Sequence, residues 1–121
     1  MTWWGRYVGL PFEAAHCWAL VRRVYAEQLG IELPEYGEVD AGALVAVARS
    51  MARGKEAWAL VTEPGLFDVA LMRGRSAVWH VGVMTDRAHV LHTERATGAV
   101  RVPITAPSVR GRIMEYRRYA A

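Results

Sequence analysis

The chain has 121 residues, of which 53% are hydrophobic and 22% charged, and its formal net charge is +3. This length suits one domain with one core, and the composition is that of a packed globular protein. No stretch approaches a membrane span, and the N-terminus lacks the basic start and apolar core of a signal peptide. We therefore expect a single domain over residues 1–121, made in the cytoplasm without a signal peptide.

The charge and the cysteine content exclude two further classes of protein. The basic residues are mostly scattered arginines, with no zinc-finger or aromatic-basic motif beside them, so no nucleic-acid partner is expected. The single cysteine, Cys17, excludes an internal disulfide framework.

The first half of the chain predicts helices. Residues Trp3–Phe12 are rich in aromatics and interrupted by glycine and proline, which favours an irregular or briefly helical segment that walls one side of Cys17. Apolar residues recur at helical spacing over Ala15–Leu29, and Gly30 is a typical stop. A second helix is expected over Ala41–Arg53, with Asp40 as its N-cap.

The second half of the chain predicts strands, because its apolar residues fall in short β-prone runs between turn signals. The connections are too short for parallel crossovers. The sequence therefore predicts an α+β fold in which N-terminal helices pack on an antiparallel β-sheet of about five to six strands. The expected strands are Trp58–Thr62, Asp68–Met72, Val78–Thr85, Ala88–Thr93, Ala99–Val102 and Arg112–Tyr119.

Cys17 begins the first helical pattern, where unpaired backbone N–H groups and the helix dipole favour a thiolate. A cysteine with its ordinary pKa is mostly protonated near neutrality, so a nearby imidazolium would also be needed to populate the nucleophile. The alternative is that Cys17 is a small buried apolar residue.

Histidines on the predicted strands supply a base for this thiol. His80 and His92 can face each other directly only if an odd-numbered loop joins their strands, such as Thr85-Asp86-Arg87. His80 would then exchange a proton with Cys17 and His92 would fix the ring of His80. Gly82 indicates close approach of a substrate or of the Cys17 helix, or a β-bulge. Either histidine could equally be an ordinary polar residue of the sheet.

A zinc site is the weaker interpretation of the same residues. His89 and His92 are spaced H-x-x-H, and Cys17 or His80 would complete a tetrahedron. Residues three apart on a strand point to opposite faces, so we expect no metal and no other cofactor. His16 and His89 have no assigned role.

Four segments together resemble the NlpC-type cell-wall cysteine peptidases: Tyr7–Phe12, His16–Arg22, Phe67–Met72 and His80–Met84. The resemblance covers nearly the whole chain. With Leu29–Pro34 and Met114–Tyr119, it is closest to the compact members from the tail-tip clusters of phages and gene transfer agents.

The resemblance implies a papain-like fold and hydrolysis of an amide in peptidoglycan stem peptides, typically between D-glutamate and the diamino acid. On matching positions Cys17 is the nucleophile, His80 the base and His92 the polar third member, where the family accepts His, Asn or Gln. The implied partners are the stem peptide and the hub proteins of a phage-like tail tip or baseplate. The implied place of action is the periplasm of the target cell, reached on the tail of a virion or gene transfer agent.

Three departures from the family pattern keep other functions open. Phe12 stands where a tyrosine is common, the stretch before the cysteine is shortened to Glu13–His16, and His16 replaces the usual aspartate. The alternatives are a catalytically inactive structural or wall-binding tail-tip module of the same fold, and an acyltransferase that uses the same thiol.

Overall fold

A computed structural model describes residues 2–33, 58–73 and 79–119 of the chain. The N-terminal part contains a 3-10 helix, η1 (Trp3–Arg6), and the α-helix α1 (Cys17–Val24), which continues as one π-helical turn, η2 (Tyr25–Leu29). Gly30 ends this helix in the left-handed conformation, with φ of 67°. The predicted first helix, its glycine stop and the briefly helical opening are confirmed; the predicted helix over Ala41–Arg53 lies outside the described residues.

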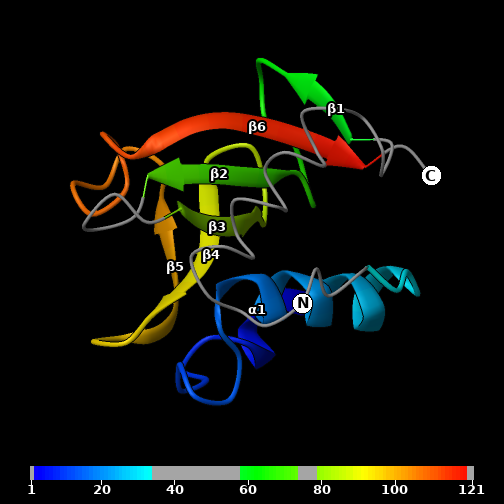
Figure 1. The fold of residues 1–121 in the computed structure, drawn as a ribbon, viewed down its shortest axis with the longest axis vertical. Helices are drawn as coiled ribbons and strands as arrows, with labels where there is room; N and C mark the ends of the chain where they lie inside the picture. The colour runs from blue at the N-terminus through cyan, green and yellow to red at the C-terminus, as the bar shows by residue number, and fades with distance from the viewer. Residues whose placement is uncertain (1, 34–57, 74–78, 120–121) are drawn as a thin grey trace.

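Six strands form one antiparallel sheet in the order β1-β6-β2-β3-β4-β5 (Figure 1). The predicted strands are confirmed to within one or two residues at each end. Their bounds are β1 (Trp58–Val61), β2 (Val69–Arg73), β3 (Trp79–Met84), β4 (His89–Glu94), β5 (Gly98–Pro103) and β6 (Ile113–Tyr119).

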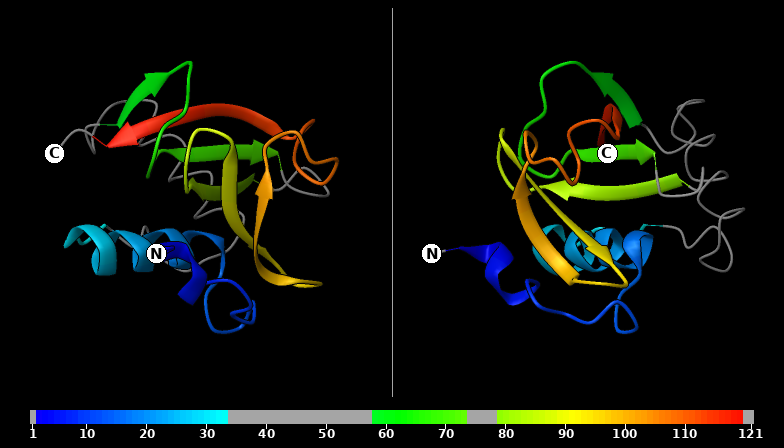
Figure 2. Two further views of the ribbon diagram at one scale, coloured as in Figure 1. Left: turned by 180° about the vertical axis from the view of Figure 1, so that it is seen from behind. Right: turned by 90° about the vertical axis from the view of Figure 1, so that its left-hand side faces the viewer.

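Helix α1 lies on one face of the sheet, as two views of the ribbon show (Figure 2). Its apolar side, with Leu20, Val21 and Val24, packs in one core with odd-numbered strand residues such as Val81 and Leu91. Even-numbered residues such as Met72 and Met84 form a second cluster, as the alternation of side chains along a strand requires. Among the described residues, no helix is both long and apolar enough to cross a membrane.

The N-terminal segment is tied to the start of β5. The amide of Gly9 donates to the carbonyl of Ala99 at 2.8 Å, and the amide of Ala99 donates to the carbonyl of Leu10 at 2.8 Å. Residues 11–16 then lead directly into α1, so this pairing helps to set where Cys17 begins its helix.

Candidate active site

Cys17 is the first residue of α1 and lies against the backbone of β3. Its side chain is buried, and its sulfur is hydrogen-bonded by backbone N–H groups of Trp18 and Val81. Val81 directly follows His80 in β3. The helix start therefore brings the sulfur to the residue next to the predicted base.

Burial decides the resting protonation state of this thiol. It raises the pKa of Cys17 to about 11, and the backbone N–H groups only partly oppose that rise. The backbone N–H groups at the helix start favour the thiolate, as expected, but the loss of water around the sulfur is the larger effect, so the thiol is protonated at rest.

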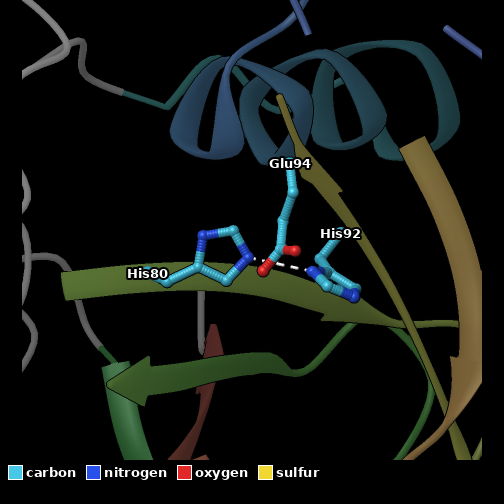
Figure 3. A group of neighbouring side chains, drawn as sticks. All are labelled: His80, His92 and Glu94. Carbon is cyan, nitrogen blue, oxygen red and sulfur yellow. Dashed lines mark hydrogen bonds between the residues drawn. The ribbon is translucent and has the colours of Figure 1, made fainter. Parts of the chain in front are cut away.

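His80 and His92 are hydrogen-bonded to each other across β3 and β4. Nε2 of His80 lies 2.9 Å from Nδ1 of His92, and the two rings meet edge to face at 81°. Both side chains are buried. The two predicted histidines thus share one face of the sheet and meet (Figure 3).

His80 and His92 do not sit directly opposite each other, as a loop of Thr85-Asp86-Arg87 would have placed them. Val83 pairs with Leu91 and Met84 with Val90, and the same register continued sets Gly82 opposite His92. The amide of Thr85 donates to the carbonyl of His89 at 3.0 Å, so the odd-numbered loop is residues 86–88, one residue later than expected. The rings therefore meet along a diagonal, which histidine side chains are long enough to span.

Gly82 makes this diagonal contact possible. A Cβ at position 82 would lie 2.8 Å from Cγ2 of Val90, 2.9 Å from the carbonyl oxygen of Leu91 and 3.0 Å from Cβ of His92. Gly82 therefore admits the close approach of β4. This corrects the expectation that the glycine makes room for a substrate or for the Cys17 helix.

Both imidazoles are neutral in the resting protein. Burial, followed by the repulsion that a protonated His80 would meet from His92 and from Arg112, lowers the pKa of His80 to about 3. Burial also lowers the pKa of His92, with Arg112 adding to the effect and Glu94 opposing it. A neutral imidazole can accept the proton of a neutral thiol but does not hold it at rest.

Sequence reasoning missed two charged residues at this site. Glu94 is the last residue of β4, and one of its carboxylate oxygens lies within 4.8 Å of ring nitrogens of both histidines. Arg112 donates from Nη1 to Oε1 of Glu94 at 2.7 Å. Because Glu94 is two residues beyond His92 in a strand, alternation places it on the face of His92 and could have revealed it; no sequence signal indicates Arg112.

Within the described part of the chain, His80, His92 and Glu94 form the grouping that could hold a metal ion. His89 is not in this grouping, and its Nδ1 lies 3.0 Å from Oδ1 of Asp86. The H-x-x-H spacing of His89 and His92 therefore does not bring these two residues together.

The remaining departures from the family pattern lie just before Cys17. Phe12 packs edge to face on His16, with ring centroids 4.9 Å apart, and the guanidinium of Arg95 lies 4.9 Å from the centroid of Phe12. His16 is the N-cap residue of α1 and makes no side-chain capping bond.

The family model for the NlpC/P60 family matches residues 4–118. The chain belongs to the NlpC/P60 family. This match spans α1, β1 to β5 and all but the last residue of β6, and it confirms the family that the four sequence segments resemble. Membership of the NlpC/P60 family indicates a cell-wall cysteine peptidase. A comparison with curated proteins gives no match.

Proposed function

We propose that this NlpC/P60 protein hydrolyses amide bonds in peptidoglycan stem peptides, with Cys17 as nucleophile, His80 as general base and acid, and His92 as the residue that orients His80. The observation that carries the proposal is the 2.9 Å bond between His80 and His92, together with the hydrogen bond that the Cys17 sulfur accepts from Val81, the residue after His80. A nucleophile, a base and a group that orients the base form the arrangement that acyl transfer to a side chain needs.

In the proposed reaction, the sulfur of Cys17 attacks the amide carbonyl as its proton passes to His80. His80 then gives this proton to the leaving amine, and water hydrolyses the thioester with His80 as base. The backbone N–H of Cys17, at the start of α1, contributes to stabilising the oxyanion of the tetrahedral intermediate.

The geometry of the two rings is compatible with these roles. His80 can accept from the thiol on Nδ1 if its Nε2–H donates to Nδ1 of His92, and Figure 3 draws the second ring nitrogen of His80 on the side toward α1. His92 then carries its hydrogen on Nε2, a buried atom without a hydrogen-bond partner among the described residues. In this tautomer, Nδ1 of His92 accepts the hydrogen bond from His80 and so orients the ring of His80.

The finer parts of the proposal rest on the sequence resemblance. We propose the bond between D-glutamate and the diamino acid as the scissile bond. We also propose that the protein is carried by the tail tip or baseplate of a phage-like particle and acts in the periplasm of the target cell.

One observation favours a second candidate function, a non-catalytic structural or wall-binding module. The thiol pKa is raised to about 11 and the His80 pKa is lowered to about 3, so the resting site is far from a thiolate–imidazolium pair. A module of this kind would bind peptidoglycan and leave its covalent structure intact.

The experiment that separates these candidates uses a synthetic stem peptide, L-alanyl-γ-D-glutamyl-diamino acid. We expect the wild type to release the diamino acid with a free amine, and His80→Gln to lower kcat by about 10²–10⁴-fold, the usual contribution of general acid–base catalysis. His92→Asn should retain more activity than His92→Ala, because an amide can still orient His80. A wild type that binds the peptide and never cleaves it would establish the non-catalytic module.

A further inference from the structure

Glu94 brings a negative charge to the buried histidine pair. Its carboxylate lies beside the hydrogen bond between His80 and His92 (Figure 3), within 4.8 Å of both rings, and its side chain is only 18% exposed. A charge at this range and depth is poorly screened by water and acts strongly on a neighbouring ring.

Arg112 fixes this carboxylate in place. Its Nη1 donates to Glu94 at 2.7 Å and to the carbonyl of Ser108 at 3.0 Å, while its Nε donates to the carbonyl of Arg73 at 2.8 Å. The amide of Arg73 in turn donates to the carbonyl of Arg112 at 2.7 Å. The guanidinium is thus held at the junction of β2 and β6, and it presents a rigid partner to Glu94.

The other groups around His80 leave Glu94 as the source of negative charge. In the described part of the chain, β4 offers His92 and Glu94, and the approach to β6 offers the cation Arg112. On α1, the neutral thiol of Cys17 is bonded to the N–H of Val81, the residue that follows His80. The paired residue on β2 is the apolar Met72. Of these groups, only Glu94 favours a positive charge on His80.

We propose that Glu94, held by Arg112, is a positioning residue of this site that stabilises the imidazolium form of His80. This inference rests on the proposed function, because that reaction passes the Cys17 proton to His80. The imidazolium exists only after the sulfur attacks, so the carboxylate lowers the energy of the transition state more than that of the resting site. The cation of Arg112 keeps Glu94 ionised before the proton moves, since it lowers the pKa of Glu94.

The test compares Glu94→Gln with Glu115→Gln. Glu115 also pairs with an arginine from a strand, Arg117 at 3.1 Å, but lies outside the His80–His92–Glu94 group. We expect Glu94→Gln to lower kcat on the stem peptide about tenfold, which corresponds to about 1.4 kcal/mol of lost transition-state stabilisation, without raising KM. Glu115→Gln should match the wild type. An unchanged kcat in Glu94→Gln, or an equal loss in both variants, would overturn the inference.

A second readout keeps the inference separate from peptidase activity. Iodoacetamide alkylates the sole thiol, and at pH 7 the thiol proton passes to His80 as iodide leaves. Glu94→Gln should slow this reaction relative to Glu115→Gln, whereas equal or faster alkylation would overturn the role of Glu94. If the wild-type protein cleaves no peptide but Glu94→Gln is alkylated more slowly than Glu115→Gln, the peptidase activity is refuted and the role of Glu94 beside His80 is retained.

Discussion

At the scale of single residues, burial and charge set the chemistry of the site more than residue type does. A cysteine at a helix start and two histidines on strands could be predicted from the sequence, because those residue types stand in recognisable local patterns. Their resting protonation could not, because it depends on how much water the folded core removes from Cys17 and His80. Arg112 escaped prediction for the same kind of reason, since only the fold brings residue 112 to the end of β4.

The state of the thiol can be measured directly, because Cys17 is the only cysteine. The difference in absorbance at about 240 nm between the wild type and Cys17→Ala reports the thiolate alone. Since burial raises the pKa of Cys17 to about 11 and lowers that of His80 to about 3, we expect no thiolate signal at neutral pH and a rise only in alkaline solution. A thiolate signal that persists down to pH about 5 would instead reveal an ion pair at rest.

At the scale of elements, the sequence predicts the strands well and their register less well. Alternation and an odd-numbered loop correctly predict that His80 and His92 share a face. The shift from a direct to a diagonal pair comes from the turn, which closes at Thr85 and His89 and so moves the whole of β4. No local pattern fixes which residues close a bend of this kind.

Gly82 should be the position where the register is most easily disturbed. A Cβ there meets Val90, the backbone of Leu91 and His92, all at 3.0 Å or less. We expect Gly82→Ala to lower the free energy of unfolding by about 1–3 kcal/mol, as overpacking of a buried site does, and to reduce peptide cleavage by displacing His92. Urea denaturation and the stem-peptide assay measure the two effects.

Gly111→Ala is the matched control, because a Cβ at position 111 meets nothing within 4 Å. It should leave both stability and cleavage close to those of the wild type. A Gly82→Ala variant as stable and active as Gly111→Ala would show that β4 can retreat without cost to the site.

At the scale of the whole molecule, the feature that the sequence could not predict is the order of the strands. β6 lies between β1 and β2, although some forty residues separate it from β2 along the chain. An ion pair to a buried carboxylate supports this arrangement: the half-exposed Arg118 donates from Nε and Nη2 to Asp68 at 2.9 and 2.8 Å. Such long-range pairing depends on complementary surfaces that form only in the folded state.

The buried histidines should make the stability of the whole fold depend on pH. The pKa of His80 is about 3 in the folded protein and near 6.5 when unfolded, so between these values the unfolded chain binds more protons. The contribution of neutral His80 to the free energy of unfolding is therefore fully present above about pH 6.5 and is lost as the pH falls toward 3. From pH 7 to pH 5, His80 alone should lower the free energy of unfolding by about 2 kcal/mol, and His92 acts in the same direction.

Urea denaturation at pH 7 and pH 5 checks this expectation, because most carboxylates stay ionised across that interval. His80→Gln should lose less stability than the wild type over the same interval, retaining only the contribution of His92. Equal stability of the wild type at the two pH values would mean that His80 is protonated, or solvated, inside the fold.

The central claim is that Cys17 makes this fold a peptidase of the cell wall. The most direct measurement is digestion of purified peptidoglycan by the wild type beside Cys17→Ala, with mass spectrometry of the released fragments. We expect the wild type to release fragments ending at a newly formed stem-peptide amine and Cys17→Ala to release none. Equal release by the two proteins would contradict a role for the thiol, and release by neither would contradict the peptidase itself.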